Sequence, residues 1–198
     1  GAFTIAIVNV VSSTIAREAD GVLYTWAGPE IAVATTKAYS AQLAALYLIS
    51  VKIARVRGLI SIGDERALCA ELQRLPECIT EALKCQPDMQ RIATLYANRP
   101  SVFFLGRGLD YAAALEASLK LKEISYIHSE AYAAGELKHG TISLIEDGTL
   151  VVALATQPAL FEKTVSNIRE VVARGASVVL VTTDDFTGDE SVCQHIIR

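Results

Sequence analysis

The stretch Ser101-Val-Phe-Phe-Leu105, which runs directly into Gly106-Arg107-Gly108, decides the fold class of this chain. A short apolar run that ends in a glycine turn is typical of a strand buried in a parallel sheet. A helical pattern follows from about residue 111 to residue 125, so the order is strand, tight turn and helix. The turn lacks the full GxGxxG pattern, and we therefore interpret it first as a tight turn and second as a phosphate-binding loop.

The same alternation continues toward the C-terminus. We predict a strand at residues 149–155, a helix at 161–174 that stops at Gly175, and a strand at 177–182. Right-handed crossovers place such strands in one parallel, doubly wound sheet with helices on both faces.

A similar unit precedes this one. The apolar, β-branched residues 4–10 predict a strand buried on both faces of a parallel sheet, and residues 21–26 predict a second strand, with a short helix capped by residues 12–14 between them. A long helix is expected from about residue 35 to residue 57, with Gly58 available as its C-cap. The fold class is therefore α/β, with two doubly wound parallel sheets flanked by helices.

Two charged helical segments, at about residues 64–84 and 88–97, separate the two units, and Pro76 should kink or split the first of them. We therefore expect the C-terminal part of a first domain at residues 1–60, a helical connector at 61–98 and a second domain at 99–198. Both ends read as cut, because the first strand has no preceding partner and residues 195–198 read as the start of another strand. We expect the first sheet to be incomplete on its N-terminal side and the second to be truncated at its C-terminus.

Composition and charge exclude several classes of partner. The 198 residues are 52% hydrophobic, which is enough for a sizeable core, and the net charge of -4 disfavours a surface that neutralises nucleic-acid phosphates. The longest apolar stretch, residues 41–51, falls well short of the ~20 residues that cross a bilayer, and the first residues lack the basic region of a signal peptide. We expect a cytoplasmic protein with neither nucleic acid nor membrane as a partner.

The metal and thiol chemistry of the sequence is sparse. Its four cysteines are Cys69, Cys78, Cys85 and Cys193. They form no CxxC pair, so we read them as buried or idle thiols in a reducing cytosol. The histidines at positions 128 and 139 lack HExxH spacing, so the sequence predicts no metal site, and no cofactor is expected.

Glu116, Lys120 and Glu123 share one face of the helix predicted at residues 111–125, with Leu119 between them. Two interpretations are open. The three charged side chains can form an exposed ladder of ion pairs. Alternatively, Glu123 is a general base held beside the Lys120 ammonium at the mouth of a cleft, because a nearby cation keeps a carboxylate ionised.

Two further segments have the composition of ligand sites. His139 can cap the C-terminus of a helix before Gly140, or it can shuttle protons, because histidine titrates near neutrality. Residues 28–37 place hydroxyls and free backbone amides at the start of the long helix, which suits anions and oxygen-rich ligands. A Thr-Thr pair at such a position also serves as a plain N-cap.

Residues 28–39 and, above all, residues 117–140 resemble the isomerase part of the glutamine-fructose-6-phosphate aminotransferase family, which is built from two sugar-isomerase (SIS) domains. The likeness extends along nearly the whole chain, apart from the spacer at about 60–98. Members of this family make glucosamine 6-phosphate from fructose 6-phosphate with ammonia from glutamine, as the first step of UDP-N-acetylglucosamine synthesis. The resemblance implies sugar phosphates as ligands, a glutaminase domain on the same full-length chain, and a homodimer.

The resemblance also implies roles for individual residues. Glu123 matches the base that moves a proton between C1 and C2 of the sugar, and Lys120 matches the lysine that assists at the C1 hydroxyl. His139 matches the histidine that helps to open the sugar ring and that reaches the active site of the neighbouring subunit. Val33 and Thr35 match substrate contacts of the first SIS domain, with Thr35 at a position that serine often occupies.

The chain also departs from the family pattern. Thr141 stands where many members have proline, which can alter the turn behind the histidine. These residues do not include the glutaminase domain, the serine-rich loops that grip the phosphate, or the C-terminal tail with its imine-forming lysine. We therefore expect the chain alone not to make glucosamine 6-phosphate from glutamine or from ammonia.

Two alternatives remain open. An SIS-type glucosamine-6-phosphate deaminase or ketose/aldose sugar-phosphate isomerase needs no glutaminase, although the run at residues 135–140 favours the aminotransferase. A non-catalytic SIS sensor of sugar phosphates usually carries a basic helix-turn-helix, and nothing in this sequence is basic enough to form one.

Overall fold

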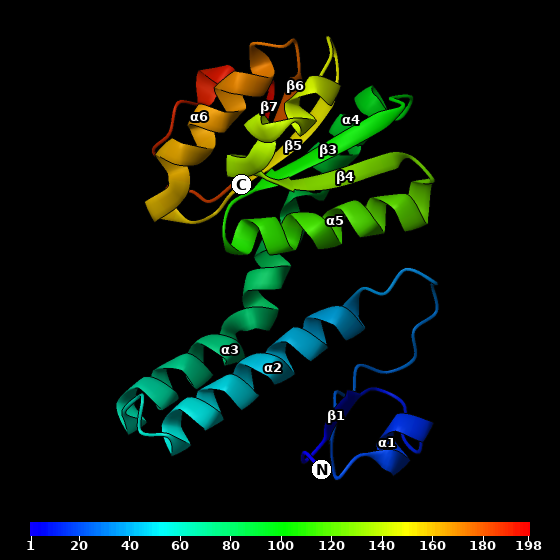
Figure 1. Cartoon of the computed structure of the whole chain (residues 1–198), viewed down its shortest axis with the longest axis vertical. Helices are drawn as coiled ribbons and strands as arrows, with labels where there is room; N and C mark the ends of the chain where they lie inside the picture. The colour runs from blue at the N-terminus through cyan, green and yellow to red at the C-terminus, as the bar shows by residue number, and fades with distance from the viewer. The chain divides into compact units, whose positions relative to one another are not determined.

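The computed structural model describes residues 1–198, and it divides into two compact units, residues 1–81 and residues 82–198 (Figure 1). None of its helices is both long enough and apolar enough to span a membrane.

The second unit is built on a sheet of five strands in the order β4-β3-β5-β6-β7, and every neighbouring pair is parallel. The strands are β3 (Ser101–Gly106), β4 (His128–Ala133), β5 (Leu150–Ala155), β6 (Ser177–Thr182) and β7 (His195–Ile197). The parallel α/β architecture expected from the sequence is confirmed. The chain leaves β3 toward one edge of the sheet and leaves β5 toward the other, so the topology reverses between these two strands.

Helices cover both faces of this sheet. Helix α6 (Phe161–Val172) packs on one face through Ile168, which is fully buried with Leu105 and Val151. Helices α4 (Gln86–Tyr96) and α5 (Leu109–Ser125) pack on the other face, where Ala114 is fully buried beside Phe104. Because the central strands are covered on both sides, they read as continuous apolar runs (Figure 1).

Strand β4 was not predicted from the sequence, which suggested only a polar segment there. The strand lies at the edge of the sheet and pairs with β3 from Ser101–His128 to Gly106–Ala133. Only Ser129 of its residues is fully buried, and the side chains on its other face are partly exposed. An edge strand with one half-exposed face carries polar residues, so its sequence does not show the apolar run of a central strand.

The first unit contains a two-stranded parallel sheet, β1 (Ile5–Val8) and β2 (Gly21–Tyr24), joined through the short helix α1 (Thr14–Glu18). Two long helices follow, α2 (Lys37–Val56) and α3 (Ile62–Ala82). The strand at β1 was expected to be buried on both faces, but only Ala6 is buried, and Ile5 is 58% exposed. A sheet of only two strands, joined through one short helix, is too small for its residues to be buried on both faces.

The segment 61–98 is divided between the two compact units. Helix α3 belongs to the first unit, whereas the short 3-10 helix η1 (Leu83–Cys85) and α4 belong to the second. Ile92 of α4 is 5% exposed and lies in the core of the second unit, which ties this helix to the sheet. Pro76 does not split α3 into two helices. The remaining 3-10 helices are η2 (Ala134–His139), η3 (Thr141–Leu144), η4 (Pro158–Leu160) and η5 (Glu190–Val192).

Candidate functional site

Helix α5 is fixed to the sheet by one face. Ala114 is 0% exposed, and Ser118 is 2% exposed against Ser129 of β4. The Ser129 hydroxyl donates to the Ser118 carbonyl oxygen at 2.8 Å, and the two hydroxyl oxygens are 3.1 Å apart. This packing sets the rotation of α5 about its axis and therefore sets which residues face outward.

The outward face carries the predicted catalytic pair. Lys120 Nζ lies 2.5 Å from Glu123 Oε2 and 3.5 Å from Glu116 Oε1, and the three side chains are 20–31% exposed. The hydrogen bond to Glu123 raises the pKa of Lys120 above its ordinary value, so the amine stays charged. The contact fixes one carboxylate oxygen of Glu123 beside a cationic group.

The surroundings of this pair are open in the second unit. Leu115, Leu119 and Ile124 flank it on α5 and are 48%, 42% and 68% exposed. A general base works best where water is excluded and its partner groups are fixed. The second unit by itself therefore supplies the charged pair but not the enclosure.

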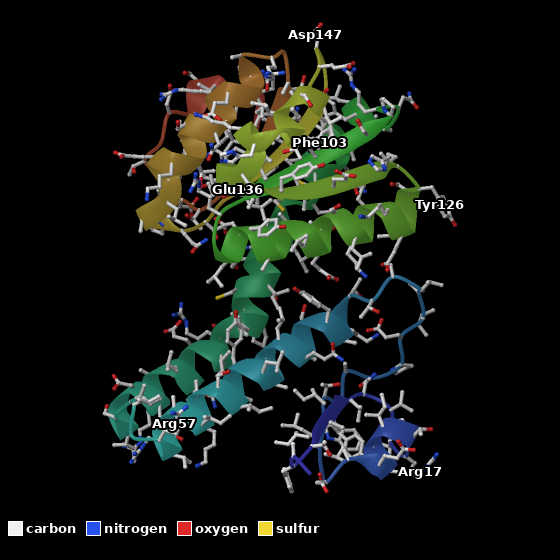
Figure 2. The ribbon with its side chains drawn as sticks, in the orientation of Figure 1. Arg17, Arg57, Phe103, Tyr126, Glu136 and Asp147 are labelled. Atoms are coloured by element: carbon white, nitrogen blue, oxygen red, sulfur yellow. The ribbon has the colours of Figure 1, made fainter.

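His139 lies elsewhere in the second unit. It ends η2, which follows the C-terminal end of β4, whereas Glu123 precedes the N-terminal end of that strand. Six strand residues separate the two ends, a distance of about 15–20 Å at the rise of a β-strand. In Figure 2 the labelled residues Glu136, in η2 after β4, and Tyr126, at the C-terminal end of α5, lie toward opposite ends of β4.

The His139 side chain is 75% exposed, and its only ion-pair contact is Glu136, 3.9 Å from Nε2. The next residue, Gly140, has φ +142°, a conformation that a residue with a side chain rarely adopts, and nothing lies within 4 Å of the position of its missing Cβ. The structure thus presents an exposed imidazole beside Glu136 on a sharply turned loop, apart from Glu123 and Lys120.

Val33 and Thr35 lie in the first unit, in the loop before α2. Val33 is 97% exposed, and Thr35 is partly buried. The Thr-Thr pair does not cap the helix, since the side chain of Thr36 at the N-cap position makes no capping hydrogen bond. Instead, Glu30 accepts a hydrogen bond from the Ala38 amide at 2.9 Å.

The turn Gly106-Arg107-Gly108 is a tight turn held by side chains. A Cβ on Gly106 would lie 2.4 Å from the backbone of Asp110, so only glycine fits there. Asp110 is 3% exposed and accepts hydrogen bonds from the amide of Thr156 at 3.0 Å and from its hydroxyl at 2.5 Å. Sequence reasoning missed Asp110, because its partner lies 46 residues away.

A hollow of about 390 Å³ lies at the opposite end of the sheet from this turn. Its lining includes Arg99, Phe103, His128 and Glu146. Because Phe103 belongs to the face that α6 covers, the hollow is separate from the charged face of α5.

Comparisons with known proteins agree with this architecture. The model of the SIS domain matches residues 1–52 and 95–197. A glutamine-fructose-6-phosphate aminotransferase (isomerizing) of Caldanaerobacter subterraneus subsp. tengcongensis is 59% identical over 197 residues, which cover 100% of this chain and 32% of that protein. The chain thus spans about a third of the length of this curated relative.

Solved structures of sugar-phosphate enzymes have the same fold as this chain. The C-terminal domain of glucosamine-fructose-6-phosphate aminotransferase from Francisella tularensis matches with a TM-score of 0.90 and 36% identity, over 98% of this chain and 55% of that chain. A glucosamine-6-phosphate deaminase from Thermotoga maritima matches with a TM-score of 0.63 and 26% identity, over 90% of this chain and 51% of that chain. The family resemblance seen in the sequence is therefore confirmed. This chain belongs to the SIS domain family, and its sequence matches the isomerase part of glutamine-fructose-6-phosphate aminotransferases.

Proposed function

We propose that this chain forms part of the isomerase half of a glutamine-fructose-6-phosphate aminotransferase, which converts fructose 6-phosphate to glucosamine 6-phosphate with ammonia from glutamine. The observation that carries the proposal is the Lys120–Glu123 contact of 2.5 Å on the outward face of α5. It occurs in a chain that is 59% identical to an enzyme of that name.

In the proposed reaction Glu123 is the base of the isomerisation. Its carboxylate takes a proton from C1 of the open-chain C2 imine that ammonia forms with fructose 6-phosphate and returns it to C2. The C1 hydroxyl proton passes to the C2 nitrogen, so that the C2=N double bond is replaced by a C1=O double bond and the C2 nitrogen becomes an amine. The positive charge of Lys120 supports this role in two ways. It holds the Glu123 carboxylate in place through the 2.5 Å contact. It can also donate a hydrogen bond to the C1 oxygen while the C1 hydroxyl loses its proton.

His139 is proposed to assist ring opening, for which a group that titrates near neutrality is suited. The separation of about 15–20 Å along β4 supports a dimer in which His139 of one copy serves the Glu123 of the other. Its exposed side chain is free to reach such a partner. We further propose that the first unit is the C-terminal part of one SIS domain and that the second unit belongs to the other.

The remaining partners follow from the same proposal. Val33 and Thr35 contact the sugar phosphate, and the open face of α5 is covered in the assembled enzyme. A glutaminase domain on the same full-length chain supplies ammonia, and the enzyme works in the cytoplasm. A deaminase is the second candidate, because the T. maritima deaminase shares the fold at 26% identity.

An assay on a complete aminotransferase that carries these 198 residues separates these candidates. With fructose 6-phosphate and glutamine, we expect glucosamine 6-phosphate and glutamate, and Glu123→Gln should lower this turnover by ~10²- to 10⁴-fold. Release of ammonia from glucosamine 6-phosphate without use of glutamine would favour the deaminase. Near-normal turnover of Glu123→Gln would show that Lys120 and Glu123 form only a surface ion pair and that Glu123 is not the base.

A further inference from the structure

The turn that carries His139 is anchored in the hydrophobic core of the second unit. Ala134 and Leu137 of η2 are both 0% exposed and belong to the core on the α6 side of the sheet. Between these anchors and the exposed His139, the backbone has no further apolar support. Apart from Ile142 of η3, which also packs against this core, the remaining support for the turn comes from charged and polar side chains.

A chain of side-chain contacts connects both ends of η2 to α6, through an ion pair at Lys138 and through the packing of Arg107 against Gly135. Lys138 Nζ lies 2.8 Å from Glu170 Oε1, and the other oxygen of Glu170 accepts a hydrogen bond from Asn167 Nδ2 at 3.4 Å. On its other side, Asn167 Oδ1 accepts a hydrogen bond from Arg107 Nε at 3.0 Å. The Arg107 guanidinium in turn lies against Gly135, since a Cβ built there would be 3.0 Å from Nη2.

Asn167 is the centre of this network. It is 5% exposed, and it uses both ends of its amide, one as acceptor and one as donor. The Arg107 backbone is itself held, because Gln157 Nε2 donates to its carbonyl oxygen at 2.7 Å. The network therefore links the turn after β3, the helix α6 and the turn after β4.

We propose that Asn167 and Glu170 are positioning residues for His139. By holding Arg107 against Gly135 and holding Lys138, they fix the conformation of η2 and thus the direction in which the imidazole points. The proposal rests on the proposed function of His139. It adds two residues of α6, neither of which contacts the charged face of α5 in this structure.

The contacts that join Arg107, Gly135, Lys138, Asn167 and Glu170 are called the clamp below. Hydrogen exchange on the 198-residue chain tests whether the clamp fixes η2, without any assay of activity. Asn167→Ala should speed the exchange of amides 135–140 about tenfold, because it leaves the half-buried Arg107 Nε without its acceptor. Exchange in β5 and β6 should stay unchanged. Arg169→Met is the matched control, since it removes the 2.8 Å ion pair with Asp189 from the same helix without touching the network. Unchanged exchange at 135–140 in Asn167→Ala would overturn the clamp.

A second pair of variants avoids the buried position. Lys138→Glu and Glu170→Lys should each speed exchange at 135–140, and the double variant, which restores opposite charges, should slow it again. Absence of this rescue would also count against the clamp.

Kinetics of a complete aminotransferase that carries these residues test the link to His139. Asn167→Ala should lower kcat about tenfold with little change in the KM for fructose 6-phosphate, because misplacing a catalytic group costs rate rather than ground-state binding. In a His139→Ala background the same substitution should cause no further loss. A loss of equal size in both backgrounds would show that Asn167 acts on the fold in general. If Glu123→Gln retains turnover, the proposed function fails, while the exchange results still decide whether the clamp exists.

Discussion

The two faces of α5 differ in what holds them. The inner face, with Ala114 and Ser118, is at most 2% exposed and is packed against β3 and β4. The outer face is partly exposed. On it the Lys120 ammonium lies between the carboxylates of Glu116 and Glu123. The inner face of the helix thus stabilises the fold, whereas the outer face carries the proposed catalytic pair. Substitutions on the two faces should therefore separate stability from activity.

The largest effect on stability is expected from the inner face. Ala114→Leu inserts three carbon atoms where no space is left, so it should lower the free energy of unfolding by about 1–3 kcal/mol. Chemical denaturation of the 198-residue chain measures this loss. A stability equal to that of the unchanged chain would show that α5 is not packed as described.

Ser118→Ala should have a smaller effect. It removes one hydroxyl of the buried pair but leaves the carbonyl oxygen that accepts from Ser129, so we expect a loss of about 1 kcal/mol. The same denaturation experiment applies. If Ser129→Ala, which removes both contacts, costs no more than Ser118→Ala, the hydroxyl pair does not hold the helix.

Lys120→Met should change stability least of the three, because exposed ion pairs contribute little. Its effect should depend on pH. The pKa of Lys120 is raised above its ordinary value of 10.5 by the hydrogen bond to Glu123, so the ion pair stabilises the fold below pH 10.5 and is lost as the pH rises through the folded-state value. The difference in melting temperature between wild type and Lys120→Met should therefore shrink above pH 10.5, and a difference that stays constant there would contradict the ion pair.

Most of the second unit could be predicted from the sequence. The strands β3, β5 and β6 are buried on both faces, so each appears as an apolar run with nearly the bounds found in the structure. Strand β4 could not be predicted in this way because it lies at the sheet edge and begins with three polar residues, His128, Ser129 and Glu130, instead of an apolar run. The first unit shows the opposite error, since β1 has the sequence of a strand buried on both faces, but only Ala6 of its four residues is buried.

The candidate site divides along similar lines. Lys120 and Glu123 could be paired from their spacing, because residues three apart on a helix are neighbours. The contact between Arg107 and Asn167 could not, because 60 residues separate them and only the packing of α6 brings them together. Helix spacing therefore predicts local pairs, whereas the network around His139 depends on tertiary structure.

The most direct test of the account is the exchange of the C1 proton of fructose 6-phosphate with solvent, measured by isotope incorporation in a complete aminotransferase that carries these residues. Glu116→Gln serves as the matched control, because Glu116 is also an ion-pair partner of Lys120 on the same face, at 3.5 Å rather than 2.5 Å. We predict that Glu123→Gln lowers the exchange rate by ~10²- to 10⁴-fold with an unchanged melting temperature, while Glu116→Gln retains most of it. Exchange at the wild-type rate in Glu123→Gln, or an equal loss in both variants, would contradict the assignment of Glu123 as the base.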